Sequence, residues 1–188
     1  MATMHCPFCH VHTSITPKLI QNLPYAVHDR MNVSWYIGEC NNCGNLVLAS
    51  QYGKVYPDPL PSPTPTEIPE AIRSNLVEAK QCASVGAWRA AVTMCRRAVQ
   101  MACIDRGAPT NTNIVGQINY LRDDHIITNE VHEWATVVRW VGNDGAHPGG
   151  SEPDQEDASA MIDLAEQFLH VLYVAPAKAA AHRAKIGK

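Results

Sequence analysis

The pattern of hydrophobic and polar positions differs between the first 56 residues and the rest of the chain. In residues 1–56 the apolar residues form short runs, at 33–38, 46–48 and 54–56, with turn-forming residues between them. Such runs predict short strands joined by tight turns. After Pro69 the apolar residues recur at every third or fourth position, which is the period of an amphipathic helix.

Five helices are predicted in this second part. They run from Glu70 to about Val85, from Ala87 to Arg106, over 114–121, from Asn129 to about Asn143, and from near Pro153 to Pro176. Gly107 and Pro176 are interpreted as the residues that end the second and fifth helices. The inward positions are predicted to be Trp88, Val92, Cys95, Val99 and Cys103 in the second helix, Val131, Trp134, Val138 and either Val141 or Gly142 in the fourth, and Met161, Leu164, Phe168 and Leu172 in the fifth.

A proline-rich segment separates the two patterns. Residues 57–69 contain six of the thirteen prolines, which favours an extended, semi-rigid connector. The predicted fold class is therefore α+β, with a small β module at 1–56, a linker at 57–69, a helical domain at 70–176 and a basic tail at 177–188. The tail is expected to be frayed and to promote solubility, and contact with nucleic acid is the alternative role.

Composition and the absence of long apolar runs bear on where the protein is located and on what it binds. The chain has 188 residues, is 46% hydrophobic and carries a formal net charge of -3, so any site for a polyanion must be local. No apolar run reaches membrane-spanning length, and the N-terminus leads directly into a cysteine motif without an export signal. We therefore expect a cytoplasmic protein without a membrane partner.

Two Cys-x-x-Cys pairs carry the strongest chemical signal. Cys6 and Cys9 are separated from Cys40 and Cys43 by thirty residues, a spacing typical of a four-cysteine zinc site with each pair on a turn. Four thiolates leave no open position for water, so one structural Zn2+ per chain is predicted. The alternative ligands are the nearby histidines His5, His10 and His12. Three further cysteines, Cys82, Cys95 and Cys103, lie in the helical region, and core packing is expected because Cys95 and Cys103 fall on the apolar stripe.

A second candidate site lies between the fourth and fifth helices. Arg139, Asn143 and His147 follow one another at four-residue steps, so a continuous helix would place them on one face. A cation, an amide and a titratable imidazole suit a phosphodiester, and one histidine cannot easily be acid and base together, which favours a dimeric site. The alternative is structural: Arg139 pairs with an acid, Asn143 caps the helix and His147 is a loop residue. Arg96 and Arg97 can bind phosphate or be solvated surface residues.

These motifs, in this order, resemble a known family. The chain has a predicted zinc ribbon, then a linker, then a helical domain that contains Cys95 to Val99, Glu133 to Ala135 and the Arg139 to His147 motif. This arrangement is similar to that of bacterial zinc-ribbon proteins whose helical domain is assigned to the HEPN clan. The family includes the ring-activated zinc-finger ribonucleases (RAZR) of phage defence. The resemblance implies an all-α HEPN-like bundle and a homodimer or larger homo-oligomer.

The same resemblance implies an activity. HEPN ribonucleases need no metal and use an arginine and a histidine from each protomer, roles that fall on Arg139 and His147, with Asn143 as the polar residue between them. The interval from Arg139 to His147 is longer than the HEPN pattern usually has, so Arg96 or Arg97 is the alternative phosphate ligand. An RNA substrate and a phage protein trigger are the implied partners. A non-catalytic, dimerising zinc-ribbon adaptor for nucleic acid or protein is the competing hypothesis.

Overall fold

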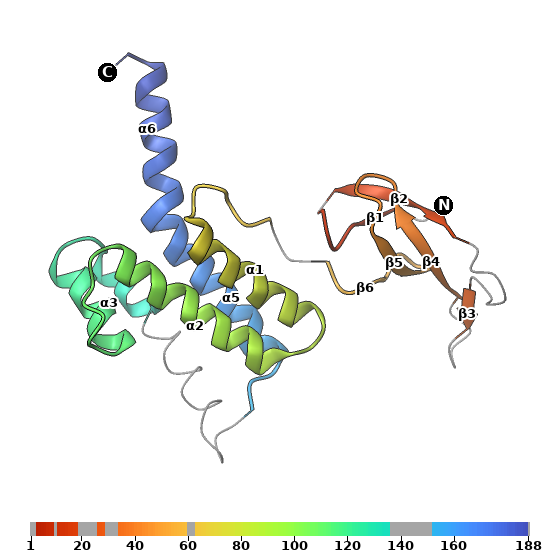
Figure 1. Cartoon of the computed structure of the whole chain (residues 1–188), viewed down its shortest axis with the longest axis horizontal. Coiled ribbons are helices and arrows are strands. Elements are labelled where there is room, and N and C mark those ends of the chain that lie inside the picture. The colour runs from red at the N-terminus through yellow and green to blue at the C-terminus, as the bar shows by residue number, and fades with distance from the viewer. Residues whose placement is uncertain are drawn as a thin grey trace. The chain divides into compact units, whose positions relative to one another are not determined.

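The computed structural model describes residues 3–9, 11–18, 26–28, 34–59, 63–135 and 152–187. The chain divides into two compact units, Met1–Pro63 and Thr64–Lys188, which differ in secondary structure (Figure 1). The first unit is an antiparallel sheet that carries a cysteine cluster, and the second is built from helices. The predicted α+β class is confirmed.

The described residues of the first unit form six antiparallel strands. In chain order they are β1 (Thr3–His5), β2 (His12–Pro17), β3 (Ala26–His28), β4 (Ser34–Cys40), β5 (Leu46–Ser50) and β6 (Val55–Tyr56). The sheet order is β1-β2-β4-β5-β6, and β3 pairs with β4. Strands are therefore present at the three predicted apolar runs, whereas β1, β2 and β3 were not individually predicted because their apolar runs are short.

One face of this sheet forms a small core. Its buried side chains are Met4, Cys6, Ile15, Cys40, Val47, Ala49 and Val55. Gly38 on β4 permits the close approach of β2, because a Cβ at this position would lie 2.9 Å from the Thr16 carbonyl oxygen. Apolar side chains also lie outside this core, and Leu46 and Tyr56 among them are 59% and 53% exposed.

The second unit contains a single helical core. Its elements are α1 (Glu70–Ser84), α2 (Trp88–Asp105), α3 (Ile114–Asp123), a helical stretch at 129–135, α5 (Gln155–Leu169), a π-helical turn η1 (His170–Val174) and α6 (Ala175–Lys185). Asn113 caps α3, and Asp154 begins α5 in a reciprocal capping box with Asp157. None of the helices in the described part of the chain has the length and apolar content needed to cross a bilayer.

The predicted inward stripes are mostly correct. In α2, Val92, Cys95, Val99 and Cys103 are all buried. The prediction for Trp134 is wrong, because its side chain is 39% exposed. The buried stripe here passes through Ile127, Val131 and Ala135, which are spaced by four residues, and Trp134 lies one position off that stripe.

Pro176 does not end the last helix, contrary to the prediction. The chain continues from α5 through η1 into α6, with Pro176 in the first turn of α6. Proline lacks the N–H that would otherwise bond the Leu172 carbonyl four residues earlier. The Arg106 guanidinium donates to that carbonyl instead, and it also stacks over the Tyr173 ring, 4.2 Å from the ring centroid. The π-helical turn and the external donor together let the helix pass the proline.

A buried charge connects the start of the unit to α5. Lys80 on α1 is fully buried, and its ammonium forms an ion pair with Glu166 on α5. The same ammonium donates to the Thr64 hydroxyl at 3.1 Å. Ile68 is also buried in the helical core. The last residues of the proline-rich segment therefore fold with the helical unit.

Candidate functional site

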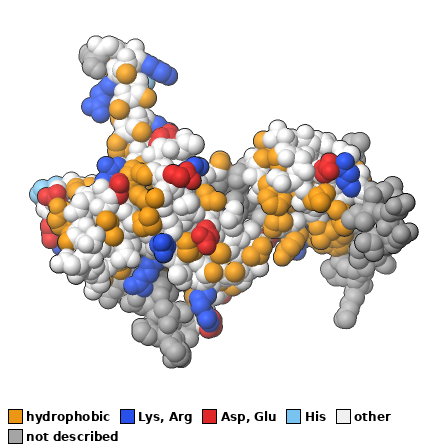
Figure 2. All heavy atoms as spheres, viewed as in Figure 1, with side chains coloured by type: hydrophobic (Ala, Val, Ile, Leu, Met, Phe, Trp, Pro, Cys, Tyr) orange, Lys and Arg blue, Asp and Glu red, His pale blue; other side chains and the backbone are white. Residues whose placement is uncertain are grey.

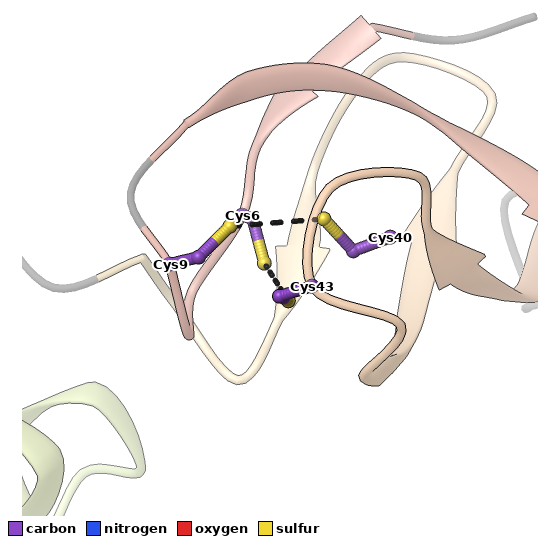
Figure 3. Close-up of side chains that lie close together, drawn as sticks. All are labelled: Cys6, Cys9, Cys40 and Cys43. Atoms are coloured by element: carbon purple, nitrogen blue, oxygen red, sulfur yellow. Dashed lines mark hydrogen bonds between the residues drawn. The ribbon is translucent and has the colours of Figure 1, made fainter.

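Four cysteine side chains converge in the first unit (Figure 3). Cys6 and Cys9 come from the turn after β1, and Cys40 and Cys43 from the end of β4 and the turn that follows it. The Sγ atoms of Cys6 and Cys43 are 3.7 Å apart, those of Cys9 and Cys40 are 3.8 Å apart, and all four lie within 4.8 Å of one another. The sheet thus brings together the two pairs that the sequence predicted to share a site.

The sulfur positions fit a tetrahedral zinc ion. With Zn–S bonds of about 2.3 Å, tetrahedral geometry places neighbouring sulfurs about 3.8 Å apart. The two short sulfur–sulfur distances match this value. Zn2+ would be held by Cys6, Cys9, Cys40 and Cys43, and its chemistry there would be to cross-link the two turns, since four thiolates complete its coordination.

The local backbone supports both turns. The Cys6 N–H donates to the Val11 carbonyl at 3.1 Å, and the Cys40 N–H donates to the Asn45 carbonyl at 2.9 Å. Gly44 has a φ of 74°, a left-handed conformation that glycine adopts without a steric penalty, and its N–H donates to the Cys40 carbonyl at 2.8 Å. These bonds hold the second Cys-x-x-Cys pair in the tight conformation that a shared ion requires.

Two asparagines complete the surroundings of the sulfurs. The Asn42 side-chain amide donates to the Cys9 sulfur, and that of Asn45 donates to the Cys43 sulfur, each at 3.4 Å. Hydrogen bonds from the Val11 backbone and from Asn42 lower the pKa of the Cys9 thiol to about 6. Donors of this kind stabilise thiolates and orient metal ligands. The prediction missed both residues, although asparagines beside a Cys-x-x-Cys pair are a visible signal.

The alternative ligands do not join this cluster. His5 and His12 face each other across β1 and β2, with ring centroids 4.8 Å apart, and both are exposed. His10 lies outside the described residues. Among the described residues, the group that can hold an ion consists of the four cysteines alone.

The cysteines of the helical unit behave as core residues. Cys95 and Cys103 are fully buried on α2, as predicted, and Cys82 on α1 is half-buried. Burial raises the pKa of both the Cys95 and the Cys103 thiol to about 12. Both thiols are therefore protonated near neutral pH and act as small apolar side chains.

Arg96 and Arg97, the predicted phosphate ligands, lie on α2. On the same helix Cys95, Ala98 and Val99 are buried in the core. Arg96 lies at the flank of this stripe and is half-buried, and Arg97 is exposed. Arg96 and Arg97 thus lie at the flank and on the outer surface of α2.

Arg139, Asn143 and His147 lie in 136–151, outside the described residues. The described residues that border this segment are tied to the core. Ala135 is fully buried on one side, and Pro153 is buried on the other. Glu152 accepts two hydrogen bonds from the Arg89 guanidinium on α2, at the edge of a groove of about 680 Å3 that Cys82 and Trp88 also line. The described residues on either side of 136–151 thus belong to the helical unit.

The fold and the cysteine cluster together define a class of protein: an α+β chain with a sheet whose four-cysteine cluster could hold a metal ion, followed by a helical unit. The family model for the domain of unknown function DUF4145 matches residues 77–186, which is more than half of the chain. The chain belongs to the DUF4145 family. No curated protein and no solved structure matches it.

Proposed function

We propose that this protein is a metal-independent endoribonuclease effector of bacterial anti-phage defence, with a HEPN-like helical domain similar to that of RAZR. A phage protein activates it in the cytoplasm, and it then cuts RNA at a site formed on a homodimer or a larger homo-oligomer. The observation that carries this proposal is the order of modules in one chain. A four-cysteine ribbon precedes a DUF4145 helical unit, and that unit contains the Arg139 to His147 motif.

The proposed chemistry assigns one role to each motif residue. The imidazole of His147 in one protomer takes the proton from the RNA 2′-hydroxyl, and the oxygen attacks phosphorus. The bond from phosphorus to the 5′-oxygen breaks, and the partner's His147 protonates that leaving oxygen. Arg139 stabilises the charge on the phosphoryl oxygens, with Arg96 or Arg97 as the alternative cation, and Asn143 orients the hydroxyl or the imidazole.

The zinc ion has no part in these steps. A complete set of four thiolates has no position for water or substrate, so the ion's role in this proposal is to fold the ribbon. In this proposal the ribbon is the module that binds the activating phage protein.

Cleavage of purified tRNA and total RNA tests the proposal. His147→Ala is expected to reduce the cleavage rate by about 100-fold or more, because general acid–base catalysis contributes at least that much. His125→Asn is the matched control: His125 is an exposed histidine of the same unit at a φ of 56°, a backbone conformation that asparagine tolerates. Cleavage should survive EDTA on protein that retains its zinc, and the products should end in 2′,3′-cyclic phosphates. Cleavage by His147→Ala at the rate of the unmodified protein would contradict the proposal.

A second candidate function has its own support. The ribbon sheet exposes large apolar side chains, including Leu46 and Tyr56, which suits a non-catalytic adaptor that binds a protein or nucleic acid. The adaptor hypothesis predicts binding without turnover for both the unmodified chain and His147→Ala. The same RNA assay therefore separates the two functions.

A further inference from the structure

Helix α6 has no packing role in the helical unit. It spans Ala175–Lys185, follows the π-helical turn and projects from the bundle (Figure 1). Every residue from Ala175 to Gly187 is exposed, and α6 contributes no buried side chain. An isolated helix of this length is marginal in water, so its continuity with α5 and η1 stabilises it. A helix of about 16 Å is thereby presented to solvent on all sides.

The charge on this helix has one sign. Lys178, His182, Arg183 and Lys185 are its titratable residues, and residues 175–187 contain no aspartate or glutamate. Lys and Arg atoms are visible on the projecting helix in Figure 2. Within the described part of the chain, no carboxylate forms an ion pair with these three Lys and Arg side chains. The basic groups therefore remain available to an external anion, although the whole chain carries a net charge of -3.

The spacing places three of the four basic residues along one side of the helix. Lys178, His182 and Lys185 follow steps of four and three residues, so they share a face over about 10 Å of helix. Arg183 lies roughly 130° around the helix from the centre of this face, at about 100° per residue. The remaining positions of the helix are alanines, apart from Pro176. A row of cations on a straight rod suits successive phosphates of a polyanion. The alanine face lacks the large apolar side chains with which amphipathic helices insert into membranes.

We propose that the basic side chains of α6, which are Lys178, His182 and Lys185 on one face and Arg183 elsewhere on the helix, bind the phosphate backbone of single-stranded RNA. The choice of RNA among polyanions rests on the proposed ribonuclease function, whereas the binding itself does not depend on cleavage. The contacts carry no base specificity, because they involve phosphates only. The helix thus adds affinity for RNA in general and leaves the choice of cleavage position to the catalytic site.

The test compares RNA binding by full-length proteins that all carry His147→Ala, so that the probe stays intact. Binding of fluorescein-labelled oligouridylate is followed by anisotropy between about 0.05 and 0.3 M salt. Each lost phosphate contact lowers the slope of log affinity against log salt by about 0.7 for single strands. Lys178→Gln, Arg183→Gln and Lys185→Gln together should therefore lower the slope by about 2 and weaken binding by about 100-fold at 0.1 M salt.

A matched variant changes the alanines of the same helix. Ala177→Gln, Ala180→Gln and Ala184→Gln make the same number of substitutions without altering charge, and this variant should keep the affinity and slope of the parent. Far-UV circular dichroism shows whether both variants retain their helix. Equal RNA binding by the variant of Lys178, Arg183 and Lys185 and by its parent overturns the inference, as does no RNA binding by the parent.

Two further probes distinguish RNA from other anions. Oligothymidylate and vesicles containing phosphatidylserine are tested with the same set of proteins. Tighter binding to the DNA probe than to RNA, or binding to vesicles alone, overturns the assignment to RNA. If the proposed function is wrong, the chain with an intact His147 will not cleave RNA. The binding measurements are independent of that result, because they use proteins that carry His147→Ala.

Discussion

At the scale of single residues, Lys80 is the most constrained charge described. Its side chain is fully buried, and the Glu166 carboxylate with which it pairs is 25% exposed. Lys80→Met should lower the free energy of unfolding by about 2–4 kcal/mol, because it removes the buried ammonium that pairs with the partly buried Glu166 carboxylate. Urea unfolding followed by circular dichroism measures this loss.

The control for Lys80→Met is a double variant that removes both charges of the Lys80–Glu166 ion pair. Lys80→Met with Glu166→Leu should recover most of the lost stability, since two apolar side chains of similar volume can replace a buried ion pair. A double variant no more stable than Lys80→Met would show that the lost packing of the lysine stem, rather than the unpaired carboxylate, causes the effect.

At the scale of elements, the junction of η1 and α6 depends on a side chain from another helix. Arg106→Met removes the donor to the Leu172 carbonyl and the cation over Tyr173. A loss of about 1.5–3 kcal/mol in the free energy of unfolding is expected, as for a charged hydrogen bond. Pro176→Ala in the same protein supplies an N–H that can reach Leu172 in an α-helical turn, so it should restore about 1 kcal/mol.

A double-mutant cycle measures the coupling between Arg106 and Pro176. In the unmodified background, where Arg106 already bonds the carbonyl, Pro176→Ala should have a smaller stabilising effect. Equal effects of Pro176→Ala in both backgrounds would show that the arginine and the proline act independently.

At the scale of the whole molecule, the two units have separate hydrophobic cores. Removal of the metal with a chelator should therefore unfold the ribbon, whose core is small, and leave the helical far-UV signal and its thermal transition in place. Metal analysis should give one zinc per chain before treatment. Cys40→Ser should reproduce the effect of the chelator, and Cys82→Ser, outside the cluster, should bind zinc like the unmodified chain. Simultaneous loss of both units on chelation would contradict this expectation.

The sequence predicted those features that depend on local spacing. The helical periods of α1 to α3 and the two Cys-x-x-Cys turns depend on residues a few positions apart. The passage of the helix through Pro176 could not be predicted in this way, because it requires Arg106 from a distant part of the chain. The same holds for the Lys80 ion pair, since the helical pattern does not reveal which charge lies in the core. The roles of Arg139, Asn143 and His147 stay predictions.

The exposure of α6 also affects how the amino-acid sequence of this helix can evolve. Beyond Val174 the described residues include no buried side chain, so substitutions there cannot create a cavity or leave a buried charge without a partner. Selection for a stable fold therefore places little constraint on this helix. Its charge can be gained, lost or rearranged one residue at a time, and its affinity for a ligand can be tuned while the core and the metal site stay unchanged.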